Sequence, residues 1–183
     1  MLEASNNTAE LLRDKWLRVS EEIADACRAA GREADQVRIV GVSKYVGPEL
    51  AWQLAQAGCQ ILAENRPQLL WDKTEYFAQQ NSTPGSSLAD TTVRGSKPCH
   101  SPTWHLIGHL QRNKLRRTLP LISLLHSLDS PRLAEAISAV GVGGNLKLWV
   151  FLYLFVTIDT NKRGLAIDLL RAVLFGADDL GGL

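Results

Sequence analysis

The residue with the clearest capacity for chemistry is Lys44, which directly follows a short run of apolar and β-branched residues at 37–42. In α/β folds, side chains at the carboxyl ends of parallel strands face the ligand. A lysine on the rim of an apolar sheet can lose its proton more readily than a surface lysine, and its neutral amine condenses with aldehydes. The position alone leaves a second reading open, which is a solvated lysine at a strand end.

Three further polar side chains, Asn65, His105 and Ser127, fall at or near later predicted strands. Asn65 can hydrogen-bond a ligand, or it can form a turn or cap a helix. The imidazole of His105, between Trp104 and Leu106, can face a ligand ring, although a core histidine with internal partners is the commoner outcome. Ser127, placed just beyond the fourth strand, can donate to a ligand or belong to the turn before the next helix.

Strand and helix patterns alternate along the chain and place these residues. Apolar residues recur at helical spacing over 8–30, and Gly31 follows as a C-cap. Later strands are predicted at 37–42, 60–63, 104–107, 121–125 and 146–158, and helices at 111–118, 131–140 and 165–174, with two more starting at Pro48 and Pro67. About five strand–helix units predict a parallel sheet with right-handed crossovers, either open or closed into a barrel.

Composition favours one domain over residues 1–183, since 45% of the residues are hydrophobic and 21% are charged. Residues 81–101 are rich in Ser, Thr, Gly and Pro and lack periodicity, which predicts a flexible insertion. The apolar run at 148–158 is shorter than the roughly 20 residues of a membrane-spanning helix, and a buried strand is the better interpretation.

Charge and cysteine content exclude several classes of function. Twenty Lys and Arg against nineteen Asp and Glu give a net charge of +1, so no global field would hold nucleic acid or an anionic membrane. The three cysteines are odd in number and widely separated, with no CxxC pair to indicate zinc or a redox couple. Together with a polar amino terminus that lacks an export signal, they predict a cytoplasmic protein.

Four segments resemble, in order, the motifs of the pyridoxal phosphate homeostasis protein family, which shares its barrel with the amino-terminal domain of alanine racemase. They are the cofactor-lysine stretch IVGVSK at 39–44, AENRPQ at 63–68, WHLIGHLQRNK at 104–114 and ISLLHSLDS at 122–130, and the likeness covers roughly residues 8–139. The segment TNKRG at 160–164 resembles the family loop after the fifth strand, which implies Lys162 as a second lysine of the site.

The resemblance implies a TIM-type (β/α) barrel that is incomplete, with an amino-terminal helix and about five βα units in a single domain. It also implies pyridoxal 5'-phosphate (PLP) bound as a Schiff base to Lys44, with Asn65, His105, Ser127 and Lys162 as further contacts. The family's role is intracellular PLP homeostasis, so the expected activity is carriage of PLP without turnover of amino acids. PLP-dependent apoenzymes are the expected partners, and nucleic acid and membranes are not.

Two departures from the family pattern limit this expectation. The fifth strand ends in FVTID at 155–159 where the family has a Glu-Val-Asn-like end. The family also continues through further βα units, and its late Ser- and Gly-rich loop and Arg-Gly segment, which hold the cofactor phosphate, have no counterpart here. Since backbone amides and helix N-termini supply much of the affinity for a phosphate, we expect weak or transient binding.

Two alternatives stay open. One is an alanine-racemase-like PLP enzyme, in which a second domain would have to supply one of two bases, and nothing in the sequence resembles that domain. The other is a degenerate barrel that binds no cofactor and acts through protein partners, by the basic stretch 112–117 or by exposed sheet edges.

Overall fold

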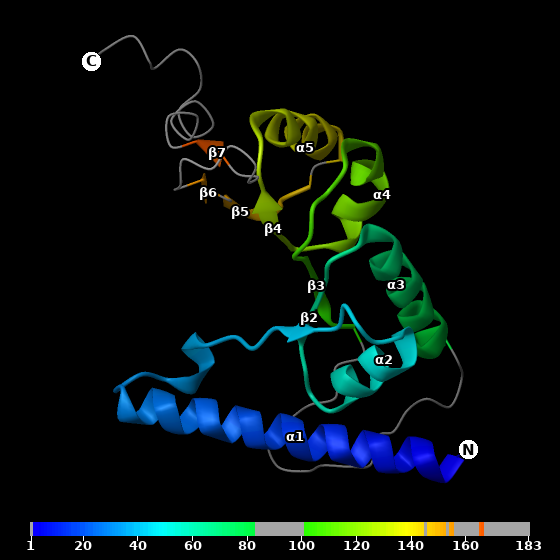
Figure 1. The fold of residues 1–183 in the computed structure, drawn as a ribbon, viewed down its shortest axis with the longest axis vertical. Helices are drawn as coiled ribbons and strands as arrows, with labels where there is room; N and C mark the ends of the chain where they lie inside the picture. Colours follow the sequence, from blue (N-terminus) through cyan, green and yellow to red (C-terminus); the bar gives the residue numbers. More distant parts are fainter. Residues whose placement is uncertain (1, 83–100, 145, 153, 156–164, 167–183) are drawn as a thin grey trace. The chain divides into compact units, whose positions relative to one another are not determined.

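The computed structural model of the chain describes residues 2–82, 101–144, 146–152, 154–155 and 165–166 (Figure 1). Its main sheet has five parallel strands in the order β1-β2-β3-β4-β5. The strands are β1 (Gly41–Val42), β2 (Ile61–Glu64), β3 (Thr103–Leu106), β4 (Leu124–Leu128) and β5 (Trp149–Leu152). Neighbouring parallel strands in sequence order are what repeated βα units produce. The α/β prediction is confirmed, and the incomplete TIM-type barrel stays a prediction.

Helices separate the strands along the chain. They are α1 (Leu2–Ala29), α2 (Pro48–Gln56), α3 (Pro67–Ser82), α4 (Leu115–Thr118) and α5 (Pro131–Gly144), with short 3-10 helices η1 (Ala34–Gln36), η2 (Arg112–Lys114) and η3 (Leu119–Leu121). Three of them start at a proline, where the missing N–H has no helical partner to lose. None of the helices in the described ranges is long and apolar enough to cross a membrane.

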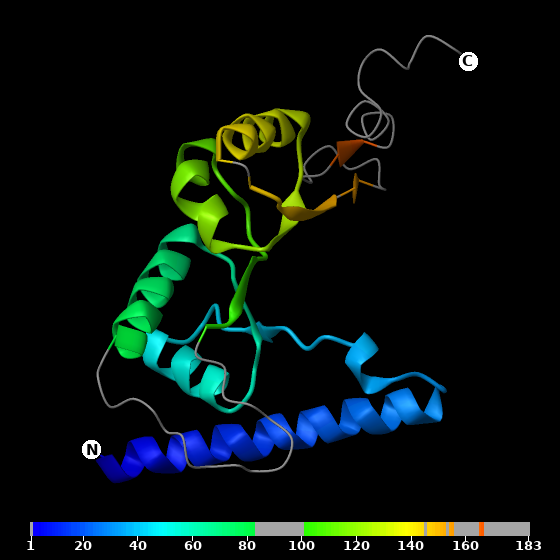
Figure 2. The ribbon, with the colours of Figure 1, turned by 180° about the vertical axis from the view of Figure 1, so that it is seen from behind.

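The chain divides into two compact units, residues 1–63 with 68–103 and residues 64–67 with 104–183. We call them the amino-terminal and carboxyl-terminal units. In the amino-terminal unit, α1 runs alongside and contacts α2 (Figure 2). Its core contains fully buried residues from α2, β2, α3 and the connection between α2 and β2: Ala51, Ala55, Cys59, Leu62, Ala63 and Leu70. A Cβ at Gly41 would lie 2.7 Å from the sulfur of Cys59, so β1 packs closely on this core only because it carries a glycine.

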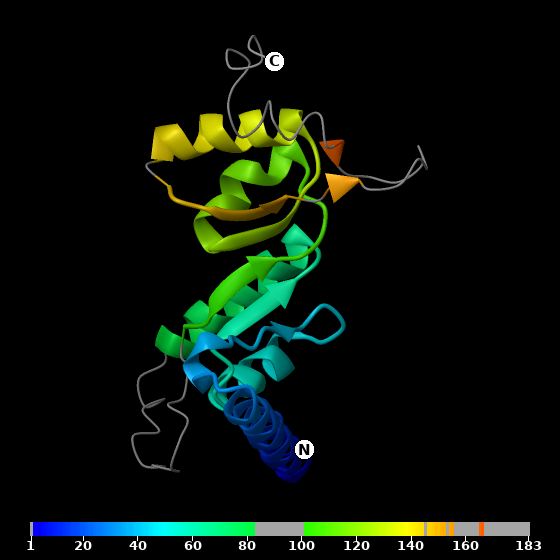
Figure 3. The same cartoon turned by 90° about the vertical axis from the view of Figure 1, so that its left-hand side faces the viewer.

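In the carboxyl-terminal unit, α4 and α5 lie on one side of β4 and β5 (Figure 3). The buried side chains of this unit are mostly leucines: Leu106, Leu110, Leu115, Leu119, Leu125, Leu128 and Leu133. Trp149 and Phe151 of β5 are exposed, at 78% and 57%. The strand β5 therefore keeps its two aromatic side chains outside the leucine core.

Several element boundaries differ from the sequence predictions. The first strand, predicted over 37–42, is paired only at 41–42. The fourth strand runs over Leu124–Leu128 instead of 121–125, because Pro120 cannot donate to a ladder and 119–121 form the 3-10 helix η3. This shift places Ser127 within a strand, and the prediction that it follows the strand is wrong.

The predictions for the last part of the chain are corrected where they can be compared. The strand predicted at 146–158 is divided into β5 and β6 (Leu154–Phe155), and residues 156–158 lie outside the described residues. Leu165 and Ala166 were predicted to start a helix, but they form β7, paired in parallel with β6. Pairing satisfies their backbone groups from outside the segment, which local helical spacing cannot foresee. Residues 167–174 lie outside the described residues, and the insertion predicted at 81–101 begins with two residues that belong to α3.

Candidate functional site

Lys44 lies in a tight turn at the end of β1. The N–H of Val46 donates to the carbonyl oxygen of Ser43 at 3.1 Å, so Lys44 and Tyr45 are the two central residues of the turn. The turn is attached to the sheet, since the N–H of Ser43 donates to the carbonyl of Ala63 at 2.9 Å. We call residues 43–46 the Lys44 turn. It leads within two residues to the first residue of α2, Pro48.

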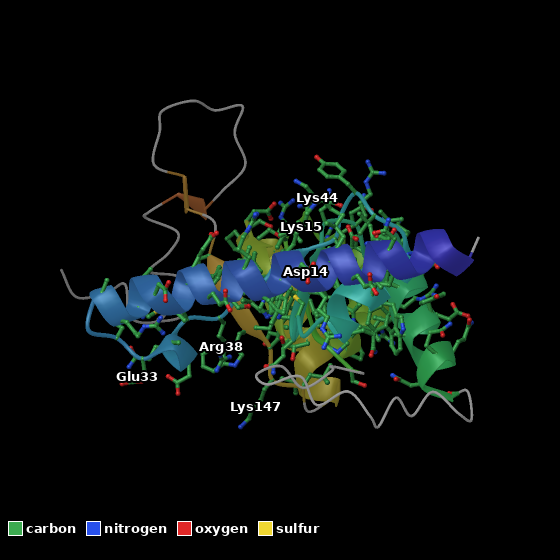
Figure 4. The ribbon with its side chains drawn as sticks, turned by 90° about the horizontal axis from the view of Figure 1, so that it is seen from below. Asp14, Lys15, Glu33, Arg38, Lys44 and Lys147 are labelled. Carbon is green, nitrogen blue, oxygen red and sulfur yellow. The ribbon has the colours of Figure 1, made fainter. Side chains whose placement is uncertain are left out.

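The Lys44 side chain is half-buried, and its Nζ lies 4.8 Å from the centroid of the Tyr45 ring. Tyr45 is 89% exposed. A cation over an exposed aromatic face gains little, so this contact holds the amine only weakly. In Figure 4, Lys44 lies at the edge of the drawn side chains. The Lys44 side chain is thus partly exposed, while the backbone that carries it is fixed.

A second lysine supports the turn from inside. Lys73 of α3 is 2% exposed, and its Nζ donates to the carbonyl oxygen of Ser43 at 2.7 Å and to the Ser43 hydroxyl at 3.2 Å. Lys73 was not among the site residues predicted from the sequence. The signal was present, because Leu70, Lys73 and Phe77 share one helical face and the two apolar neighbours are in the core. A lysine in an apolar stripe needs an internal partner.

In the carboxyl-terminal unit, the ends of three strands are connected around Gly108. The N–H of Ile107 donates to the carbonyl of Glu64 at 2.9 Å, and the hydroxyl of Ser127 donates to the carbonyl of Gly108 at 2.6 Å. A Cβ on Gly108 would lie 2.0 Å from the carbonyl oxygen of Asn65, so only glycine allows this approach. We call Asn65, Gly108 and Ser127 the strand-end cluster. It brings two of the predicted site residues together.

Asn65 differs from the other members of this cluster in the state of its side chain. Its backbone N–H donates to the Glu64 carboxylate at 2.8 Å. Its side-chain oxygen Oδ1 is buried and has no hydrogen-bond partner in the part of the chain that the structure describes. A buried acceptor without a donor costs free energy, and a ligand that donates to it would recover that cost. Ser127, by contrast, already uses its hydroxyl within the protein.

His105 is buried and engaged with a second histidine. Its Nδ1 lies 3.1 Å from Nε2 of His126, and the His126 ring packs edge-on against Phe151 at a centroid distance of 5.0 Å. One of the two facing nitrogens must donate and the other must accept. Burial lowers the pKa of His126, since desolvation disfavours its charged form. His105 has the internal partner of a core histidine, and its role in a site stays a prediction.

The remaining site prediction, Lys162, lies outside the described residues. Within the ranges described, no group of three or more His, Cys, Asp or Glu side chains is placed to hold a metal ion. In the amino-terminal unit, the primary amine of Lys44 has the chemistry to condense with an aldehyde. In the carboxyl-terminal unit, the buried Oδ1 of Asn65 can accept a hydrogen bond.

Comparisons with known proteins agree with the resemblance seen in the sequence. No family model matches the chain. A curated pyridoxal phosphate homeostasis protein from Aquifex aeolicus is 30% identical over 158 residues, which are 86% of this chain and 60% of that protein. One of the same name from Deinococcus radiodurans is 36% identical over 117 residues, or 63% of this chain and 45% of that protein. The chain thus spans less than two thirds of these relatives.

Solved structures give the same result. A protein of unknown function from Bifidobacterium adolescentis matches with a TM-score of 0.69 and 30% identity, covering 91% of this chain and 64% of that one. PipY of Synechococcus elongatus, solved with PLP bound, matches with a TM-score of 0.56 and 26% identity over 74% of this chain and 54% of PipY. Over the part that it spans, the chain is therefore a homologue of the pyridoxal phosphate homeostasis proteins.

Proposed function

We propose that the chain binds PLP through a Schiff base on Lys44 and serves intracellular PLP homeostasis as a carrier that does not turn over amino acids. The observation that carries the proposal is the Lys44 turn, which presents a half-buried amine from a backbone fixed to β2 and α3. The PLP bound to PipY and the names of the curated relatives support it. PLP-dependent apoenzymes in the cytoplasm are the proposed recipients.

When bound, PLP supplies an aldehyde, and the chain supplies the amine that condenses with it and releases water. The reacting form of Lys44 is neutral, so its proton must leave before the bond forms. The turn fixes the Cα of Lys44, while the flexible side chain reaches the aldehyde carbon. A fixed backbone lowers the entropy lost on binding, which favours the linked state.

The other site residues have separate proposed roles. The buried Oδ1 of Asn65 accepts a hydrogen bond from the ligand, and Ser127 holds the Gly108 carbonyl so that the strand-end cluster keeps its form. His105 is proposed as a neutral contact to the ligand ring, with its Nδ1 held by His126. Lys162 is proposed as the second lysine of the site. None of these roles abstracts a proton from an amino acid, as a racemase requires.

The test is an absorbance titration of the purified chain with PLP, before and after borohydride reduction, for wild type and Lys44→Ala. We expect an imine band near the visible edge in the wild type and its loss in Lys44→Ala. Lys15 of α1 is an exposed lysine of the same unit (Figure 4), so Lys15→Ala is the matched control and keeps the band. Mass spectrometry of the reduced protein locates the modified residue.

Identical spectra for wild type and Lys44→Ala would refute carriage at Lys44. If the wild type then still folds cooperatively, the degenerate barrel that acts through protein partners becomes the better reading. Release of D-alanine from L-alanine by the PLP-loaded chain would instead favour the racemase-like alternative.

A further inference from the structure

Ser43 is the most heavily bonded residue of the Lys44 turn. It is 1% exposed, and both its N–H and its hydroxyl donate to the carbonyl of Ala63, at 2.9 and 3.2 Å. Its own carbonyl accepts from the N–H of Val46, which closes the turn. The same carbonyl and the hydroxyl also accept from the buried Nζ of Lys73. Ser43 therefore connects the Lys44 turn both to β2, through Ala63, and to α3, through Lys73.

The contact from Lys73 joins segments that are 30 residues apart in the chain. Burying an ammonium group is costly, and the cost is recovered only through well-formed hydrogen bonds. An apolar residue at this place in the core face of α3 would avoid the cost altogether. Lys73 instead lets α3 donate a hydrogen bond directly to the backbone of Ser43, the residue before Lys44.

We propose that Lys73 is a positioning residue for Lys44: its bonds to Ser43 fix the turn in the form that presents the Lys44 amine. The proposal deepens the proposed function and rests on it. Lys73 itself is not the linking amine, because its side chain is 2% exposed and its Nζ is bonded to Ser43. Its effect reaches the ligand only through the backbone of the turn, where the linked state needs a fixed Cα.

The main variant is Lys73→Met, which keeps most of the volume and the unbranched shape of the side chain but removes the donor. The matched control is Phe77→Leu, one turn further along the same face of α3, where Phe77 packs edge-on against Trp52 at 4.9 Å. It perturbs the core of the same unit without removing a donor to Ser43. Ser43→Ala is a third variant, which removes the hydroxyl and leaves the carbonyl.

Two measurements are made on each variant. Amide hydrogen exchange over residues 43–47 reports the stability of the turn in the absence of PLP. Titration with PLP, with borohydride trapping to confirm Lys44 as the site, reports the affinity. For Lys73→Met we expect faster exchange at the amide of Val46 and an affinity about tenfold weaker. Phe77→Leu lowers the thermal midpoint but leaves both readings near those of the wild type, and Ser43→Ala gives a smaller change in the same direction as Lys73→Met.

The outcomes separate the inference from the function on which it rests. If wild type links PLP at Lys44 and Lys73→Met does so equally well with unchanged exchange, the positioning role is wrong and the carrier function stands. If wild type fails to link PLP, the carrier function is wrong, and unchanged exchange in Lys73→Met would overturn the anchoring of the turn as well. Should Lys73→Met not fold, Ser43→Ala decides, and wild-type exchange and affinity in that variant overturn the inference.

Discussion

The Lys44 turn and the His105–His126 pair handle ionisable groups in opposite ways. At the turn, the side chain of Lys44 is partly exposed, and hydrogen bonds between Lys73 and Ser43 hold the backbone of the turn. In the pair, the two imidazoles bond each other, and one of them is 8% exposed. A group that is to react with a ligand must keep its own bonding capacity unused while its backbone is held. Lys44 meets this condition. In the pair, Nδ1 of His105 and Nε2 of His126 are already bonded to each other.

The strand-end cluster contains both kinds of group, one bonded within the protein and one without a partner within the described ranges. Ser127 is satisfied within the protein, as the histidines are, while Oδ1 of Asn65 is buried without a partner in the described residues, which leaves it ready for a ligand. The tight approach of Gly108 restricts the backbone of Asn65. Substitutions in each region test whether this difference is real.

The largest effect is expected at Gly108. In Gly108→Ala the new Cβ would meet the Asn65 carbonyl oxygen at 2.0 Å, and backbone cannot move aside cheaply. We expect the free energy of unfolding to fall by about 3 kcal/mol. Urea denaturation followed by circular dichroism measures it. Gly143→Ala is the control in the same unit, since nothing lies within 4 Å of its Cβ, and it should be neutral or slightly stabilising because alanine favours the helix. Equal stability of the two variants would contradict the tight cluster.

The next effect is a dependence of stability on pH that originates at His126. Its pKa is lowered in the folded protein by burial, so the unfolded chain takes up a proton first as the pH falls. The stability that comes from neutral His126 is present above its unfolded pKa of about 6.5 and is lost as the pH falls through the folded pKa. We expect wild type to lose more stability than His126→Gln between pH 8 and pH 5, measured by urea denaturation at each pH. An equal loss in both would show that the pair is not a buried neutral one.

The smallest effect on stability is expected at Lys44. Its amine lies over the exposed Tyr45 ring, and the backbone hydrogen bonds of the turn do not depend on the Lys44 side chain. Lys44→Ala should therefore change the free energy of unfolding by less than about 0.5 kcal/mol, although it removes the proposed linkage to PLP. Thermal denaturation without PLP tests this. A loss of stability comparable with that of Gly108→Ala would mean that Lys44 is a structural residue, and the contrast between the two regions would fail.

The order of strands and helices and the family resemblance could be predicted from local features of the sequence. Prolines at helix starts and short apolar runs are local signals, so α2, α3 and α5 were predicted to begin where they do. Lys44 was predicted at a strand end because its position depends only on the run of residues before it. The family resemblance agrees with two curated relatives that are 30% and 36% identical to this chain over 158 and 117 residues.

Which polar groups are bonded within the protein became visible only in the folded chain. Lys73 and Ser43 are 30 residues apart, and His105 and His126 are 21 apart, so no local pattern specifies either contact. Ser127 lies within β4 because the strand begins later than predicted, after Pro120. Its hydroxyl donates a hydrogen bond to the carbonyl of Gly108. Hydrogen bonds across neighbouring strands and helices form according to register and burial, which are properties of the packed chain. For this reason the residue types pointed to an amine at Lys44, whereas the contact between the buried Lys73 and Ser43 became visible only in the fold.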